Sequence, residues 1–70
     1  MITEQEVVSS QFKKVKYNSE DKTLVITFKN NKQYLYLDVP VATFKDLMES
    51  ESLGKYFIAN IKNSFSFKPL

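Results

Sequence analysis

The sequence predicts an α+β domain in which a three-stranded antiparallel β-meander is followed by two α-helices packed on one face of the sheet. Apolar and polar residues alternate over the first half of the chain, as in strands with one buried face, and apolar residues recur at helical spacing over residues 40–62. A chain of 70 residues builds a single domain with a thin core. We therefore expect one domain over residues 1–70, with its core in 8–62 and flanking tails at 1–7 and 63–70.

The first predicted strand covers residues 11–17. Val15 and Tyr17 alternate correctly in it, whereas Phe12 is out of phase with them. A β-bulge near Lys13 and its neighbour would return Phe12 to the core face, because a bulge adds one residue to one strand. The polar residues that follow form a turn by composition.

The second predicted strand, residues 23–29, has the clearest pattern in the chain. Its apolar residues Leu24, Ile26 and Phe28 alternate with residues suited to an outer face, so we place it at the centre of the sheet. The two asparagines that follow turn the chain, since Asn tolerates the positive φ of a hairpin. They lead into a third strand over residues 33–37.

Two turn lengths are compatible with this hairpin, and they differ in which face the tyrosines occupy. A two-residue turn at 30–31 pairs Ile26 with Leu35 and places Tyr34 and Tyr36 on the outer face. A three-residue turn pairs Ile26 with Tyr36 and places both tyrosines over the core. Periodicity does not decide between them, because this strand is apolar on both faces and a slip of one residue exchanges the faces.

The two helices are predicted over residues 40–50 and 53–62. Pro40 suits the first position of a helix, where its missing N–H group would have no partner. Asp38 is placed to cap the first helix or to sit near its positive end, and Ser52 is a good N-cap for the second.

The only glycine of the chain, Gly54, lies in the first turn of the second predicted helix. Glycine inside a helix costs about 1 kcal/mol relative to alanine, so we expect another segment of backbone to approach it closely. The predicted core combines the inward residues of the strands with one face of each helix: Phe12, Val15, Leu24, Ile26, Phe28, Phe44, Leu47, Met48, Leu53, Phe57 and Ile61.

The composition excludes several kinds of chemistry. The chain has no Cys and no His, so it has no disulfide, thiolate ligand, His-based zinc site or His general base. We see no nucleophile beside a base, and we expect no enzyme, no cofactor, no metal site and no small-molecule substrate. The amino-terminal residues do not resemble a signal peptide and no apolar run is long enough to span a membrane, so we expect a cytoplasmic protein without membrane contact.

Charge is unevenly distributed along the chain, although the net charge is only +2. Residues 11–37 hold six lysines and two acids, whereas residues 38–53 hold one lysine and four acids. The basic strand half is a candidate phosphate-binding surface, and a solubilising surface explains it equally well. The candidate residues for nucleic-acid binding are Lys13, Lys14, Lys16, Lys29, Lys32, Tyr34, Tyr36 and Lys55.

Three of these candidates have a structural explanation that we favour. The tyrosines could stack on bases, but a small core needs large side chains, so we expect them to be core residues with hydroxyls at the rim. Lys55 follows Ser52 and Gly54 at a helix start that could bind a phosphate through its N–H groups. A cap combined with helix packing explains that segment without a ligand.

Four spaced motifs give the chain a resemblance to the KTSC domain family. They are V-S-S at 8–10, V-x-Y at 15–17, Y-x-Y-x-D-V-P at 34–40 and S-x-G-K-Y-F-x-x-N-I-K at 52–62. The family is named after a carboxy-terminal appendage of some lysyl-tRNA synthetases and includes short bacterial and phage proteins. The resemblance therefore implies RNA binding by analogy with the synthetases.

The chain departs from the family pattern at the hairpin. Family members usually have Gly in the turn and a polar residue between the two tyrosines, where this chain has Asn30, Asn31, Lys32 and, between the tyrosines, Leu35. A polar middle residue implies inward tyrosines and favours the three-residue turn. It also leaves Leu35 exposed, as a contact for a partner.

Two functions follow as expectations. The first is a non-enzymatic RNA-binding module that uses the basic strand face. The alternative is a protein-interaction module, for example a phage accessory protein acting on a host factor, or a self-associating domain. Its contacts would be the acidic helix face or the apolar residues Leu35, Phe65 and Phe67, the last two of which also allow a short fourth strand.

Overall fold

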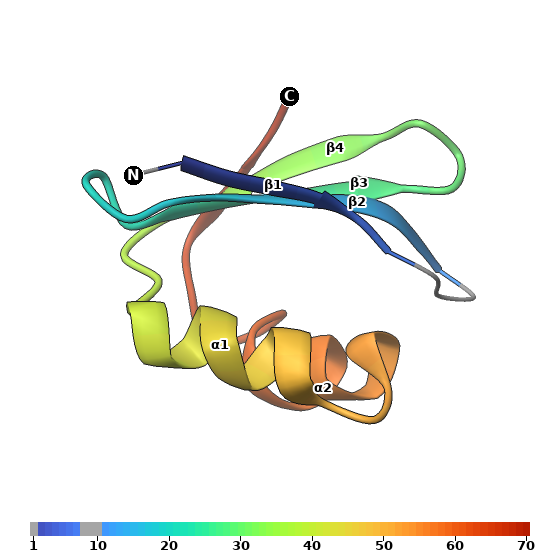
Figure 1. Ribbon diagram of the computed structural model, residues 1–70. Helices are drawn as coiled ribbons and strands as arrows, with labels where there is room; N and C mark the ends of the chain where they lie inside the picture. The colour runs from blue at the N-terminus through green and yellow to red at the C-terminus, as the bar shows by residue number, and fades with distance from the viewer. Residues whose placement is uncertain (1, 8–10) are drawn as a thin grey trace.

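A computed structural model gives the structure of the protein and describes residues 2–7 and 11–70. One antiparallel sheet has the strand order β1-β2-β3-β4-β5, and Figure 1 shows both helices on the same side of it. In chain order the elements are β1 (Ile2–Glu6), β2 (Phe12–Asn18), β3 (Thr23–Phe28), β4 (Gln33–Tyr36), α1 (Val41–Glu49), α2 (Leu53–Asn60) and β5 (Phe67–Pro69). The motif at 8–10 lies outside the described residues.

The α+β prediction is confirmed, but the sheet has five strands where the sequence predicts three. Strand β1 occupies the segment expected to be a tail, and it pairs with β2 through Glu4 opposite Lys16 and Glu6 opposite Lys14. Four of its five residues are exposed, so β1 lacks the alternating apolar pattern that marks a strand in sequence. Its pairing depends on the backbone ladder and on cross-strand charge pairs.

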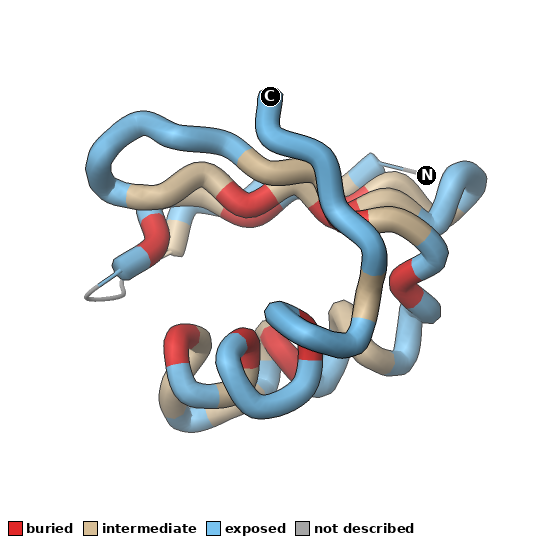
Figure 2. Tube along the Cα trace, turned by 180° about the vertical axis from the view of Figure 1, so that it is seen from behind, coloured by how far each residue is buried: buried red, intermediate tan, exposed pale blue. Residues whose placement is uncertain are grey.

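Strand β5 is the second addition, at the opposite edge of the sheet. It comprises three residues and pairs with β4, with Phe67 opposite Tyr36 and Pro69 opposite Tyr34. Proline is compatible with this position because an edge strand has one side without a ladder partner. The carboxy-terminal segment runs up from the helices to the sheet, as Figure 2 shows from behind.

The predicted bulge in β2 is confirmed, because the pairing with β3 shifts between Phe12 and Lys14. Both registers considered for the next hairpin are wrong: Ile26 lies opposite Tyr34, neither Leu35 nor Tyr36. The loop contains three residues but begins one residue earlier than expected. The amide of Phe28 donates to the Lys32 carbonyl at 2.9 Å.

Asn31 supplies the positive φ of this loop, at 68°, which Asn tolerates better than most residues. The three-residue turn was expected to place both tyrosines over the core. That expectation is confirmed despite the shifted register, since both tyrosines lie on the helix side of the sheet. Tyr36 is buried there and Tyr34 is half-buried.

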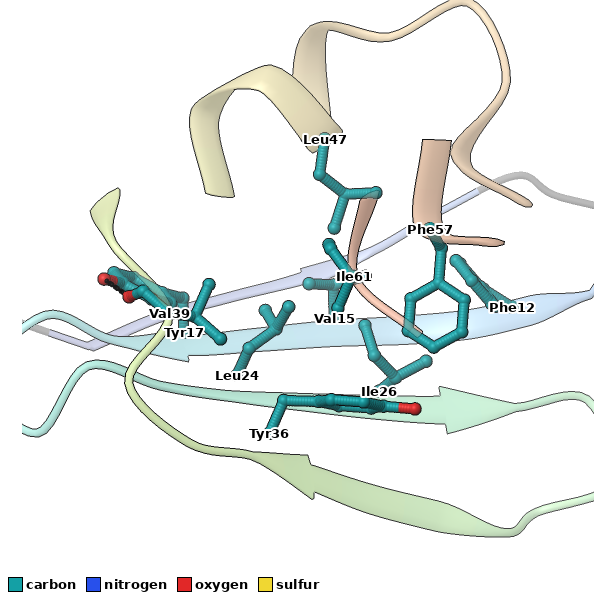
Figure 3. Packing of buried hydrophobic residues seen from close by; sticks show 10 residues of the cluster. All are labelled: Phe12, Val15, Tyr17, Leu24, Ile26, Tyr36, Val39, Leu47, Phe57 and Ile61. Carbon is teal, nitrogen blue, oxygen red and sulfur yellow. Dashed lines mark hydrogen bonds between the residues drawn. The ribbon is translucent and has the colours of Figure 1, made fainter. Parts of the chain in front are cut away.

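The core fills the space between the sheet and the helices. Seven predicted core residues are buried, while Phe28, Phe44, Met48 and Leu53 are only partly buried at its margin. Tyr17, Tyr36 and Val39 are buried in addition. Figure 3 shows the buried set, which is Phe12, Val15, Tyr17, Leu24, Ile26, Tyr36, Val39, Leu47, Phe57 and Ile61.

The helices begin and end within two residues of the predicted bounds, and α2 ends two residues earlier than expected. Ser52 caps α2 as predicted, because its Oγ accepts from the amide of Lys55 at 3.3 Å. The capping role proposed for Asp38 is wrong. Pro40 occupies the N-cap position without a side-chain cap, and Asp38 adopts a positive φ of 57° in the preceding turn.

The group that lies close to Gly54 is the side chain of Gln11, whereas a segment of backbone was expected there. A Cβ built on Gly54 would lie 3.4 Å from the Gln11 Cδ and 3.5 Å from its Oε1, which is ordinary van der Waals contact. Gly54 also has no positive φ that would require glycine.

We therefore expect Gly54→Ala to stabilise the protein by up to about 1 kcal/mol, through the higher helix propensity of alanine. Urea unfolding followed by circular dichroism measures this difference. A loss of stability would contradict the prediction and would mean that the Gln11 side chain cannot yield to the methyl group.

Candidate functional site

A cleft of about 450 Å³ opens between the inner face of β4 and β5 and the outer part of α2. Strands β4 and β5 supply aromatic rings to it, and α2 with the turn after it supplies the facing wall. Its lining is predominantly apolar, with a few polar groups at its margin: Gln11, Phe28, Tyr34, Tyr36, Phe57, Ile58, Lys62, Asn63 and Phe67. Pockets of this character are the usual sites of ligand binding.

The aromatic rings of the cleft hold one another in place. The Tyr34 ring lies 5.5 Å from that of Phe28 and 5.7 Å from that of Phe67, in edge-on contacts at 75° and 82°. Tyr36 contacts Phe57 at 5.3 Å and Phe67 at 5.4 Å. Such contacts stabilise the arrangement beyond simple burial, so the cleft wall is preorganised.

A second hollow of about 420 Å³ continues the cleft toward the tip of the β3–β4 hairpin. Gln11, Phe28 and Tyr34 line both spaces, so the two form one groove. The second hollow adds Lys29, Asn30 and Lys32, and the cleft itself contains Lys62. Among the described lining residues of this groove there are three lysines and no acid.

The remaining candidate lysines do not line this groove. Lys14 and Lys16 lie on the outer face of the sheet, opposite Glu6 and Glu4 of β1. Lys14 Nζ forms an ion pair with Glu4 Oε1 at 2.8 Å. Strand β1, which the sequence analysis missed, thus places acids beside lysines that were expected to form a basic surface.

The pKa values of this exposed pair follow from their contact. A hydrogen bond from Lys14, together with its positive charge, lowers the pKa of the Glu4 carboxyl. The same contact raises the pKa of the Lys14 ammonium. Both groups therefore stay charged at neutral pH, and the outer sheet face presents compensated charge.

Two further lysine candidates occupy separate positions. Lys13 lies in the bulge of β2, and its Nζ donates to Asn31 Oδ1 at 3.2 Å, at the back of the hairpin tip. Lys55 is exposed in the first turn of α2, where its amide already donates to the Ser52 hydroxyl. The structure thus brings together Lys29, Lys32 and the two tyrosines.

The apolar residues that were candidates for protein contact do not lie together on one surface. Leu35 lies on the outer face between Val25 and Lys68, and it is half-buried, not exposed as expected. Phe65 is half-buried against the core. Phe67 has 50% of its surface exposed and lines the cleft.

Sequence reasoning did not identify Gln11, Ile58, Lys62 and Asn63 as site residues. Ile58 lies in α2, whereas Lys62 and Asn63 lie in the turn after that helix. No local pattern in the sequence shows that this end of α2 and the turn after it face β4 and β5.

The cleft offers stacking surfaces and hydrogen-bonding groups. Burial, and secondarily the neighbouring Tyr34, raises the pKa of the Tyr36 hydroxyl, which therefore remains protonated at neutral pH. No three metal-ligating side chains come together within residues 2–7 and 11–70. No helix in the described part of the chain is long and apolar enough to cross a membrane.

This fold and cleft define a small α+β domain with an aromatic groove between a five-stranded sheet and its second helix. The chain belongs to the KTSC domain family, whose model matches residues 8–65. It is similar to a KTSC domain protein of Yersinia pestis with a crystal structure, at a TM-score of 0.94 and 28% identity over 100% of this chain and 99% of that one. It is also 33% identical to a protein of Tsukamurella paurometabola, over 87% of this chain and 91% of that protein.

Proposed function

We propose that the protein is a cytoplasmic, non-enzymatic module that binds single-stranded RNA in the groove running from the hairpin tip to the cleft. The observation that supports this function most directly is the lining of the groove. Aromatic rings line one end, Lys29 and Lys32 line the other, and no acid lies among the described residues between them. Proteins that bind single strands combine these two features.

In this proposal the groove is the RNA-binding surface, in place of the basic strand face that the sequence indicated. Lysines at the hairpin tip would contact phosphates, because an ammonium group is a flexible point charge, and the rings would contact bases. Lys14 and Lys16 lie outside the groove in this arrangement, and each is opposite a glutamate. Few phosphate contacts imply weak binding, and each contact adds to its dependence on salt.

Replacing both tip lysines, Lys29→Ala with Lys32→Ala, is expected to weaken RNA binding and flatten its salt dependence. Each phosphate contact to a single strand contributes about 0.7 to the slope of log K against log salt, so the double variant should lose about 1.4. Fluorescence anisotropy of labelled single-stranded RNA over a range of salt concentrations measures this slope.

The matched control is Lys16→Ala with Lys68→Ala. Both lysines are exposed on the outer face of the sheet, and the control removes the same charge from the other side of the domain. We expect its salt slope to equal that of the unaltered protein. An equal loss of slope in both double variants would contradict the groove, and absence of binding at low salt would exclude RNA as the ligand.

A protein partner is the second candidate function, and one observation favours it. Ile58 and Phe67 are 49% and 50% exposed at the same cleft, which gives it an apolar mouth. An apolar contact would not weaken as salt rises, so salt-insensitive capture of a protein, lost in Phe67→Ser and retained in Leu35→Lys, would support this function instead.

A further inference from the structure

We infer that the cleft accepts one unpaired nucleobase, inserted beside Phe67 and Ile58, while the tip hollow holds the adjoining phosphates. This inference rests on the proposed function and specifies how the groove divides its ligand. The two parts of the groove share Gln11, Phe28 and Tyr34 and differ in what each adds to them. The cleft adds mainly apolar side chains, among them Phe67, Ile58 and Phe57, whereas the tip hollow adds Lys29, Asn30 and Lys32. A nucleotide divides in a similar way, into a base with flat π-faces and an anionic phosphate.

The accessible surfaces of the cleft are suited to a flat ring. Phe67 approaches from β5 and Ile58 from α2, and about half of each side chain is exposed. The other rings are less accessible, since Tyr36 and Phe57 are each only 3% exposed and Phe28 and Tyr34 are half-buried. A base entering the cleft would therefore lie against Phe67, and every base has a π-face that can do so.

The cleft is large enough for a base, and Phe67 is the one ring of its lining that is about half exposed. Its volume of about 450 Å³ is at the lower end of the range for small-ligand sites, which is roughly 300–1,000 Å³. Asn63 contributes a side-chain amide to the lining, and amides can hydrogen-bond to the edge of a base. Lys62 adds a cation at the helix side.

The charge of the groove favours a nucleotide over an aromatic side chain of a peptide. Lys62 lies at one end and Lys29 and Lys32 at the other, with no acid among the described lining residues. An anionic chain therefore meets a cation on either side of the aromatic wall. An aromatic peptide segment would need acidic neighbours to gain the same attraction.

The test compares a short single-stranded RNA with a base-free ribose-phosphate chain of the same length and charge. Stacking of one base contributes about 1–3 kcal/mol, so we expect the base-free chain to bind about 5-fold to 150-fold more weakly. In Phe67→Ser this difference should largely disappear, because RNA binding falls to the level of the base-free chain.

A control variant and a measurement on the unaltered protein show whether the effect of Phe67→Ser arises in the cleft. Val41→Ser is the matched control, since Val41 is 49% exposed on α1, and it should retain the full difference between the two ligands. Nuclear magnetic resonance of the unaltered protein with adenosine or uridine monophosphate should shift the Ile58 methyl and Asn63 side-chain signals without any substitution.

The outcomes separate this inference from the function on which it rests. Equal binding of RNA and the base-free chain would overturn base insertion and leave the RNA-binding groove intact. No binding of either ligand would overturn both. Mononucleotide shifts confined to residues outside the cleft would also overturn the inference, because they would place the base elsewhere.

Discussion

Replacing Phe57 with alanine is expected to remove a large share of the stability of the protein. The Phe57 ring is 3% exposed and lies between the sheet and α2. Its centroid is 5.2 Å from that of Phe12, 5.3 Å from that of Tyr36 and 6.0 Å from that of Phe28. One substitution therefore removes the ring that joins three strands to the second helix.

The expected cost is large compared with the stability of so small a domain. Replacing a buried Phe with Ala typically costs about 3–5 kcal/mol, since the protein loses apolar burial and retains a cavity. A chain of 70 residues has a total stability of about 4–10 kcal/mol. The substitution therefore removes a large share of the total, and the variant should unfold at a much lower denaturant concentration.

Chemical denaturation followed by circular dichroism measures this loss, and the neighbouring residue provides the control. Ile58→Ala removes an apolar side chain from the same helix, but Ile58 is 49% exposed, so its cost should stay below about 1 kcal/mol. If the two variants were equally stable, Phe57 would not be the central contact of the core.

The sequence predicted the parts of the fold that have a strong local pattern. Strand β3 has strict alternation, and the bulge in β2 followed from Phe12 being out of phase. Strands β1 and β5 could not be recognised in the same way. The first buries almost no apolar surface, and the second has three residues and contains Pro69.

The hairpin register shows a different limit. Strand β4 is apolar on both faces, so periodicity does not fix its alignment with β3. The turn itself decides it: Asn31 adopts the positive φ, and the Phe28 amide bonds to Lys32. The register is therefore set by the backbone conformation of the loop. The composition of the loop is compatible with more than one turn, so it does not predict that conformation.

The candidate site was predictable only where it depends on one hairpin. Lys29, Lys32 and Tyr34 are close together in any hairpin over these residues, and the structure places all three on the tip hollow. Lys62 and Phe67 join them only because α2 and β5 return to the sheet. That long-range packing has no local signal in the sequence.

The second large effect is expected for Tyr17→Phe, which removes one hydroxyl from the core. The Tyr17 hydroxyl donates to the Val39 carbonyl at 2.6 Å, and Val39 is fully buried just before α1. The Tyr17 ring also stacks on Phe44 at 4.6 Å, a contact that phenylalanine retains. The substitution therefore tests the hydrogen bond that ties β2 to the chain leading into α1.

We expect Tyr17→Phe to lower the free energy of unfolding by about 2 kcal/mol. A buried carbonyl that loses its donor pays about 1–3 kcal/mol of desolvation, which exceeds the net value of an ordinary hydrogen bond. The control is Tyr34→Phe, which removes the same hydroxyl from a half-buried ring that lines the open groove. Water reaches that position, so its cost should stay below about 0.5 kcal/mol.

The pH dependence of this variant identifies the hydroxyl as the cause. Burial raises the pKa of Tyr17 above its ordinary value of 10.0, so the folded protein keeps this proton at a pH where the unfolded chain loses it. The stabilisation is complete below pH 10 and declines as pH rises toward the pKa of the folded state. The stability difference between the unaltered protein and Tyr17→Phe should therefore shrink above pH 10 in chemical denaturation. A difference that stays constant there would show that the hydroxyl is not held in a buried, protonated state.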